Sequence, residues 1–408
     1  MNISDILNPL LSGDTLISQL SVFPSYDVDI INKSESERLI ALMDIYNLYI
    51  PSQMSIEIYS KLYLATLRSL QKKDTKIAIK QRYENYNCIN NKSYQGIIGG
   101  SDSFTIIGTS GIGKSSAISR AVNSFIKNDV IKLVNPYTDI IPCLVVQCPF
   151  DSSVKGLLLE ILRNIDNKLN TNYYNSVVKS RTATTDMLIG MVSNLAINHI
   201  GLLIVDEIQN VVNSKNGKNL IGSLTQLINN SGISICMVGT PESNRFFEQA
   251  MFLARRSVGL NYSFLPFDDY FISFCNVLFK YVYVRNPIQY KDMLIKWLYD
   301  HSKGITAVVV ALVHDAQEIA ILEGLEVLDI NTLTKAYNNR ISLLQNYIDI
   351  QDTSVSSNVK NDTKIKTEFN NTYQSENIIE QLVKKSKKEN LNIIDLLKDI
   401  CNIEEVCI

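Results

Sequence analysis

The sequence predicts an α/β fold built on a parallel β-sheet with helices on both faces. Three observations lead to this class. Between about residues 96 and 265, short apolar runs alternate with longer segments of helical periodicity. The runs are continuously apolar, as in strands that are buried on both faces. The residues before and after this stretch carry helical periodicity, so helical regions are expected on either side of the sheet.

The elements of the sheet domain follow from this alternation. Strands are expected at 104–108, 143–148, 202–206, 234–238 and 261–265. Apolar residues recur at helical spacing in 153–169 and in 185–198, which places a helix in two of the connections. The stretch around 166 to 184 leaves room for an insertion.

A glycine-rich loop joins the first strand to the next helix. It comprises Gly108, Thr109, Ser110, Gly111, Ile112, Gly113, Lys114, Ser115 and Ser116. The glycines allow backbone amides to surround a β-phosphate at the N-terminus of the helix. Lys114 is expected to reach the β- and γ-phosphates, and the Ser115 hydroxyl is expected to bind Mg²⁺. The pattern predicts a site for ATP and Mg²⁺, with a glycine turn that binds nothing as the alternative.

A pair of acids ends the third predicted strand. Residues 201–207 read Gly-Leu-Leu-Ile-Val-Asp-Glu, a buried strand followed by two carboxylates. Asp206 is expected to hold Mg²⁺ or its water shell, and Glu207 is expected to polarise the attacking water. The alternative is a core strand that stops at a polar turn. The glycine-rich loop upstream favours the first interpretation, and the two motifs together predict a P-loop NTPase.

The fourth strand and the segment after it narrow the prediction to AAA+ ATPases. Thr240 follows the strand where these enzymes place sensor 1, a polar group that orients the lytic water. Arg255 and Arg256 precede the last strand, where an arginine can cross a subunit boundary and neutralise charge on the neighbour's γ-phosphate. We favour Arg256 as this finger. An arginine pair that complements a helix dipole is the alternative.

Residues 1–95 are expected to form a helical N-terminal region that contacts a partner or DNA. Amphipathic helices are predicted at 35–47 and 52–70. The lysine-rich stretch from Lys72 to Arg82 is either a solvated helix face or a face that contacts phosphates.

Residues 266–348 are expected to form a helical lid over the sheet domain. Its helices are predicted at 268–283, 288–301, 305–323 and 331–348. The lid has Gly304-Ile305-Thr306-Ala307 where most AAA+ lids carry a sensor 2 arginine. This departure predicts slow hydrolysis, suited to a timed switch.

The composition changes again near the C-terminus. Residues 349–376 are rich in polar residues and are expected to be a flexible linker. Residues 377–408 carry apolar stripes among lysines and are expected to be an amphipathic tail. The tail either docks onto the lid or serves as a helix that enters a partner's groove.

Four blocks of the sequence resemble the TnsC family, the AAA+ regulators of Tns-type transposons, and its relative TniB. They are Gly201–Asn210, Met237–Pro241, Leu253–Arg256 and Ser302–Thr306, and the resemblance spans about 100 to 345. It implies ATP-dependent assembly of a homo-oligomer, as a ring or a filament, around double-stranded DNA. It also implies recruitment by a target selector of the TnsD/TniQ type and activation of transposase subunits of the TnsA/TnsB type. The alternatives are another DNA-associated AAA+ switch, such as a helicase loader or replication initiator, and a nucleotide-binding signalling scaffold.

Contact with DNA is expected at the helix that follows the second strand, because in ring-forming AAA+ clades this helix start faces the pore. Ser153 and Lys155 would hold a phosphate there without reading bases. A plain helix N-cap is the alternative. The turn that contains Lys179 and Arg181 is a second candidate.

Composition bounds the remaining possibilities. The 408 residues are 46% hydrophobic and carry a formal net charge of −2, so binding to DNA requires a local basic surface. No apolar run reaches the length of a membrane span and no signal peptide is recognisable, so we expect a cytoplasmic protein with no membrane contact. The seven cysteines lack paired spacing and are expected to be reduced, and the three histidines predict no metal-ligand cluster.

Overall fold

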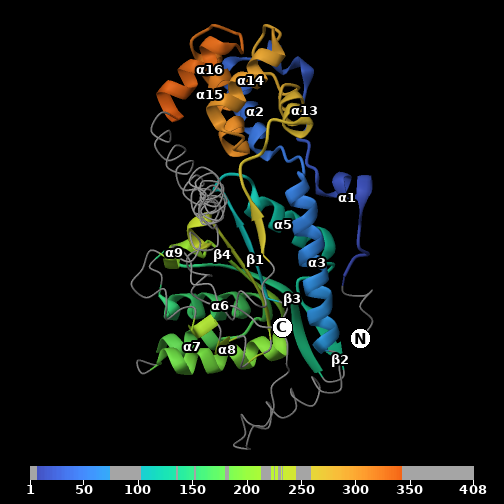
Figure 1. Ribbon diagram of the computed structural model, residues 1–408, viewed down its shortest axis with the longest axis vertical. Helices are drawn as coiled ribbons and strands as arrows, with labels where there is room; N and C mark the ends of the chain where they lie inside the picture. The colour runs from blue at the N-terminus through green and yellow to red at the C-terminus, as the bar shows by residue number, and fades with distance from the viewer. Residues whose placement is uncertain are drawn as a thin grey trace, which may run out of the picture. The chain divides into compact units, whose positions relative to one another are not determined.

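Figure 1 shows the computed structural model of the chain. The residues that it describes are 7–73, 103–134, 137–150, 153–179, 183–212, 222–224, 226–227, 231, 233–244 and 259–341. Met1–Asn339 form one compact unit and Arg340–Ile408 form a second. The predicted linker at 349–376 and the predicted tail at 377–408 lie outside the described residues.

The described strands form one sheet in the order β2-β3-β4-β5-β1-β6. They are β1 Phe104–Gly108, β2 Ile131–Val134, β3 Tyr137–Gln147, β4 Ile200–Asp206, β5 Ser234–Gly239 and β6 Leu260–Tyr262. Neighbouring strands are parallel except β2 and β3, which are antiparallel. The predicted α/β class is therefore confirmed, and a strand is present at each of the five predicted places.

The antiparallel hairpin of β2 and β3 was not predicted. β2 pairs with the first half of β3 at the edge of the sheet, in a register that places Ile131 opposite Ile140. As a result, β3 begins at Tyr137, well before the apolar run at 143–148 from which it was predicted. A four-residue strand is too short to show a clear alternation of apolar and polar residues. It is defined by its pairing with β3, which the sequence alone does not reveal.

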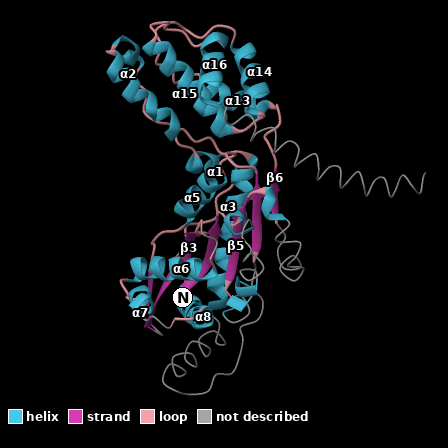
Figure 2. Cartoon of the chain, turned by 90° about the vertical axis from the view of Figure 1, so that its left-hand side faces the viewer, coloured by secondary structure: helices cyan, strands magenta, loops and turns pink. Residues whose placement is uncertain are grey.

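The sheet is buried on both faces by alternate side chains. On β4, Leu203 and Val205 belong to one apolar cluster, whereas Leu202 and Ile204 belong to the other. Helices α6 Val154–Leu169 and α8 Thr185–His199 pack on the first face, and α3 Gln53–Lys73 and α5 Lys114–Phe125 pack on the second (Figure 2). This arrangement explains the continuous apolar runs, since each central strand lies between two cores. The predicted insertion holds α7 Tyr173–Lys179.

The N-terminal region divides between the sheet domain and the lid. Helix α1 Gly13–Leu20 contacts α5, as does α3. In contrast, helix α2 Glu35–Leu42 and the 3-10 helix η3 Met43–Asn47 pack against the lid helix α15 Thr306–Leu322. The predicted helix at 35–47 is thus an α-helix that continues as a 3-10 helix. A further 3-10 helix, η2 Val28–Asn32, precedes α2.

The lid contains helices near each of the four predicted ranges. They are α13 Asp269–Leu278, α14 Lys291–Ser302, α15 and α16 Ile330–Ala336, and α16 continues as a π-helical turn at Tyr337–Ile341. None of the helices in the described part of the chain is long and apolar enough to cross a membrane.

An ion pair joins α2 to the lid. The Arg38 guanidinium donates two hydrogen bonds of 2.7 Å to the carboxylate of Glu326 and one of 3.0 Å to the carbonyl oxygen of Tyr283. The Arg38 side chain is 2% exposed and that of Glu326 is 16% exposed. We call this contact the Arg38 clamp.

Candidate nucleotide site

The glycine-rich loop forms the floor of a cavity at the carboxyl edge of the sheet. The cavity has a volume of about 240 Å³ and is lined by Ser110, Gly111, Gly113, Lys114, Ser115, Ser116, Asp206, Glu207, Gln209, Gly239, Thr240 and Ala307. We call it the phosphate cavity. Gly113 has a φ of +92°, in the left-handed region that favours glycine, and it is the N-cap of α5. The loop therefore ends at the start of a helix, where free backbone amides can bind an anion.

Lys114 lies inside this cavity and is held by the loop itself. Its Nζ donates to the carbonyl oxygens of Gly108 at 2.6 Å and Thr109 at 2.9 Å. Burial lowers the pKa of Lys114, and the nearby carboxylates of Asp206 and Glu207 oppose this shift. A buried ammonium next to two acids is a strong electrostatic partner for a phosphate group.

The structure brings Ser115 and Asp206 together, although 91 positions separate them in the chain. The Ser115 hydroxyl donates to Oδ2 of Asp206 at 2.7 Å. The Glu207 backbone N–H donates to the other oxygen, Oδ1, at 2.8 Å. A hydroxyl and a carboxylate in contact form the oxygen pair from which Mg²⁺ is held in P-loop sites.

Thr240 and Glu207 line the same cavity, and each directly follows one of two adjacent strands, β5 and β4. The Oγ1 atom of Thr240 is buried, and among the described residues it has no hydrogen-bond partner. Glu207 has a φ of +59°, an uncommon backbone conformation for a residue other than glycine. Gln209, to which the sequence assigned no role, lies between these two residues.

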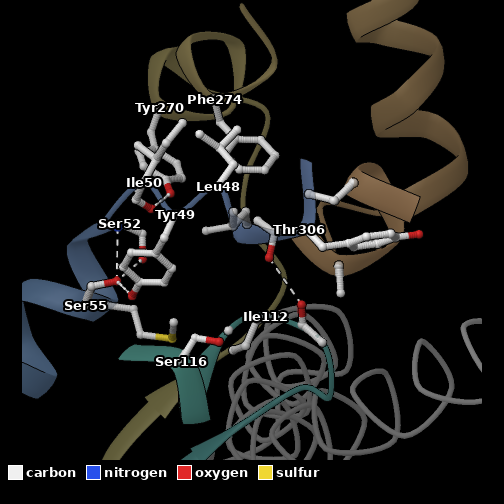
Figure 3. Close-up of a pocket in the computed structure, with 17 residues that line it drawn as sticks. Leu48, Tyr49, Ile50, Ser52, Ser55, Ile112, Ser116, Tyr270, Phe274 and Thr306 are labelled. Carbon is white, nitrogen blue, oxygen red and sulfur yellow. Dashed lines mark hydrogen bonds between the residues drawn. The ribbon is translucent and has the colours of Figure 1, made fainter. Parts of the chain in front are cut away.

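A second cavity of about 260 Å³ adjoins the phosphate cavity and shares Gly111, Gly113, Ser116 and Ala307 with it. Figure 3 shows this base cavity, named here for the part of a nucleotide that it would hold. Its walls come from three parts of the chain that are far apart in sequence. Residues 46–55, which we call the strap, contribute one wall, the glycine-rich loop a second and the lid a third.

The strap and the lid meet through polar and aromatic contacts. The Tyr270 hydroxyl donates to the carbonyl oxygen of Ile50 at 2.9 Å, and Phe274 lines the cavity from the same lid helix (Figure 3). Within the strap, the hydroxyls of Tyr49 and Ser55 lie 2.9 Å apart. The sequence did not predict this cavity. Its apolar and hydroxyl-bearing residues carry no motif, because tertiary contacts alone bring them together.

The start of lid helix α15 contacts the glycine-rich loop directly. The Thr306 hydroxyl and the Ala307 backbone N–H both donate to the carbonyl oxygen of Gly111, at 3.2 Å and 3.1 Å. Ala307 also lines the phosphate cavity. This is the segment where the sequence lacks the usual lid arginine, so the lid contacts the loop through a hydroxyl and a backbone amide.

The residues predicted to contact DNA are only partly described. Ser153 caps α6, since its hydroxyl accepts a hydrogen bond from the Gly156 N–H at 2.8 Å. Lys155 donates from Nζ to the carbonyl oxygen of Ala183 at 3.2 Å, and Lys179 ends α7. Their role toward DNA stays a prediction. Arg181 and the finger candidates Arg255 and Arg256 lie outside the described residues.

One titratable cluster away from the phosphate cavity was not anticipated. On α15, Nδ1 of His314 lies 2.9 Å from Oδ1 of Asp315. With Glu318, these side chains bring possible metal-ligand atoms within 4.8 Å of one another. The prediction that no histidine belongs to such a group is therefore corrected, because it considered histidine and cysteine spacing and left the acids of the same helix aside. The His314 ring also packs against Tyr46, with ring centroids 4.6 Å apart, so the cluster lies where η3 meets the lid.

Together these groups fit a nucleoside triphosphate with Mg²⁺. The loop has a glycine cradle, Lys114 supplies a buried positive charge, and Ser115 and Asp206 supply adjoining oxygens. The buried hydroxyl of Thr240 has a hydrogen bond left to make at the edge of the cavity. The adjoining base cavity leaves space for the rest of the nucleotide.

One comparison with known proteins bears on the fold. Residues 98–247 match a protein family described as AAA domain. No curated protein matches the chain. This match and the observed sheet identify the fold as that of AAA+ P-loop NTPases. The resemblance to TnsC stays a prediction.

Three solved structures are distantly similar. The ORC2 protein of Aeropyrum pernix (ADPNP-ADP complexes) has 17% identity and a TM-score of 0.38, with 64% of this chain and 67% of that chain covered. The Aeropyrum pernix ORC1 protein in complex with DNA has 12% identity and a TM-score of 0.40, with 64% of each chain covered. Domain III of the Thermotoga maritima replication initiation protein DnaA has 13% identity and a TM-score of 0.34, with 59% of this chain and 85% of that chain covered.

Proposed function

We propose that this chain is a Mg²⁺-dependent ATPase that assembles on duplex DNA when it binds ATP and is reset by hydrolysis, as a regulator of DNA transposition. The observation that carries the ATPase part is the convergence of Lys114, Ser115, Asp206, Glu207 and Thr240 on one cavity at the carboxyl edge of the sheet. Ligands of open α/β sheets bind at this edge.

Each of these residues has a defined part in the proposed reaction. Lys114 and the loop amides bind the phosphates, and Ser115 and Asp206 hold Mg²⁺. When bound, Mg²⁺ would neutralise charge on the phosphate oxygens. Glu207 accepts a proton from the attacking water, and the Thr240 hydroxyl orients that water.

The DNA-dependent part of the proposal rests on the resemblance to TnsC. The blocks at Gly201–Asn210 and Ser302–Thr306 that carry it lie on described residues of the site and of the lid. We infer that neighbouring copies complete the site with Arg255 or Arg256, that a TnsD/TniQ-type selector recruits the oligomer, and that the oligomer then activates TnsA/TnsB-type subunits. A helicase loader or replication initiator would share the same nucleotide chemistry.

The experiment compares the full chain with Glu207→Gln and Lys114→Ala, in two assays on the same preparations. In the first, release of phosphate from ATP is expected to fall about 100-fold or more in Glu207→Gln, because it loses its general base. Nucleotide affinity is expected to stay within about threefold of the parent. Lys114→Ala is expected to lose nucleotide binding. The matched control is Glu242→Gln, an exposed acid in the 3-10 helix η4 Pro241–Ser243 that does not line the cavity.

In the second assay, the same proteins are mixed with a fluorescent DNA duplex and a non-hydrolysable ATP analogue. The parent and Glu207→Gln are expected to bind the duplex as oligomers only with the analogue, and Lys114→Ala is expected not to bind. A chain that hydrolyses ATP but stays monomeric and leaves the duplex unbound would contradict the transposition assignment. A chain that neither binds nor hydrolyses ATP would overturn the ATPase assignment.

A further inference from the structure

The carboxamide of Gln209 bridges the ends of two adjacent strands. Its Nε2 donates a hydrogen bond to Oε2 of Glu207, which follows β4. Its Oε1 accepts a hydrogen bond of 3.2 Å from the backbone N–H of Thr240, which follows β5. Gln209 also lines the phosphate cavity beside both residues. One side chain therefore contacts the proposed general base and the segment that carries the proposed water-orienting hydroxyl.

The surrounding packing fixes this carboxamide in place. Gly239 is the last residue of β5, and a Cβ atom there would lie 2.6 Å from Cγ2 of Ile208 and 3.2 Å from Oε1 of Gln209, so glycine leaves room for these side chains. The residues that flank Gln209 are tied to the sheet on either side. The Ile208 N–H donates to the Val238 carbonyl oxygen at 3.0 Å, and Nδ2 of Asn210 donates to the Cys148 carbonyl oxygen at 3.1 Å.

The Glu207 side chain needs such a support. Its backbone is anchored by the hydrogen bond to Asp206 and by its left-handed conformation, but its carboxylate lies at the end of three rotatable bonds. A displacement of about 1 Å of a reacting group can cost about 100-fold in rate. A carboxamide donates to a carboxylate and accepts from a backbone amide at the same time, whereas a carboxylate lacks the donor and an ammonium lacks the acceptor.

We propose that Gln209 is a positioning residue that holds the Glu207 carboxylate for hydrolysis and ties its place to the end of β5. This inference rests on the proposed ATPase function. It gives a role to Gln209, a residue of the Gly201–Asn210 block whose side chain is neither charged nor nucleophilic. Gln209 acts through Glu207 and takes no proton itself.

The test is a double-mutant cycle on the full chain, measured as kcat and KM for ATP hydrolysis. Gln209→Met keeps the length of the side chain and removes both hydrogen bonds. It is expected to lower kcat by about 10- to 100-fold with KM within about threefold. Gln209→Glu keeps the acceptor for the Thr240 N–H but places a second carboxylate against Glu207. It is expected to be at least as slow as Gln209→Met, since the donor to Glu207 is the group that matters.

The double variant Glu207→Gln/Gln209→Met separates positioning from a structural role. If Gln209 acts through Glu207, the double variant is expected to be no slower than Glu207→Gln alone, because the group to be positioned is already lost. Losses that multiply, or a parent-like kcat in Gln209→Met, would overturn the inference while the ATPase assignment stands. A parent protein without hydrolysis would instead count against the proposed function. The matched control is Gln226→Met, the same change at an exposed position that lines neither cavity.

Discussion

The two halves of the candidate site are built in different ways. The phosphate cavity takes all its residues except Ala307 from three short segments: the glycine-rich loop at 108–116, residues 206–209 at the end of β4, and residues 239–240 at the end of β5. The base cavity draws on the strap, the loop and the lid, and more than 250 positions separate its first and last residues, Tyr46 and Val310. One half is therefore encoded locally, and the other exists only once the N-terminal region has packed against the lid.

Because the two cavities are built differently, we expect them to respond differently to mutation. In the phosphate cavity, the glycine-rich loop and the ends of β4 and β5 position the functional groups, so a single side chain carries a single role. In the base cavity, shape depends on contacts between the N-terminal region and the lid, and the buried Arg38 clamp is one of them. A change distant from the nucleotide is expected to affect the second half and spare the first.

The largest effect is expected from breaking the Arg38 clamp. Arg38→Met removes both hydrogen bonds to Glu326 and the one to Tyr283, and it leaves their oxygens without the charge that faced them. We expect the free energy of unfolding to fall by about 3 kcal/mol at pH 7, measured by chemical denaturation. The matched control is Arg163→Met, which breaks an exposed ion pair with Glu160 and is expected to leave the stability unchanged. Equal losses in the two variants would contradict the importance of the contact between α2 and the lid.

Acid is expected to weaken the same clamp. The hydrogen bonds from Arg38 are the main cause that lowers the pKa of Glu326 below its usual value. A carboxyl whose pKa is lower in the folded state stabilises the fold above its unfolded pKa of about 4.3, and this contribution is lost as the pH falls through the folded pKa. The gap in stability between the parent and Arg38→Met should therefore narrow on acidification below about pH 4. A gap that stays constant down to pH 3 would exclude the ion pair as its source.

The same contrast explains what could be predicted from the sequence. The central strands, and the roles expected for Lys114, Ser115 and Asp206, could be predicted from local sequence patterns. The structure brings these three side chains together in one cavity. The base cavity, the Arg38 clamp and the bridge made by Gln209 could not be predicted, since each needs knowledge of which distant segments meet. The edge strand β2 was missed for the same reason, because its partner strand defines it.

An intermediate effect is expected from filling the base cavity. Ser116 is exposed on α5 and lines both cavities, so Ser116→Trp places a large ring where the base would lie. We expect the Kd for ATP to rise about tenfold, or about 1.4 kcal/mol, in a fluorescence titration. Ser119→Trp, at an exposed position of the same helix outside both cavities, serves as the control and should bind like the parent. Equal affinities in the two variants would show that the base binds elsewhere.

The smallest effect is expected where the lid contacts the glycine-rich loop. Thr306→Val removes the 3.2 Å hydrogen bond to the Gly111 carbonyl oxygen and keeps the shape of the side chain. The Ala307 N–H still donates to the same oxygen at 3.1 Å, so the loop keeps one contact with the lid. We expect the Kd for ATP to change by about twofold, corresponding to ~0.5 kcal/mol for one exchangeable hydrogen bond.

Thr334→Val is the control for this change, because its hydroxyl donates to the Ile330 carbonyl oxygen within α16, away from the loop. Both variants should retain the parent's rate of hydrolysis within about twofold if the lid only closes the cavity. A tenfold loss confined to Thr306→Val would mean that the hydroxyl takes over the task of the missing lid arginine. The start of α15 would then contribute a functional group to the phosphate cavity as well as to the base cavity. In that case the phosphate cavity would also depend on the packing of the lid, and the two halves would differ less than proposed.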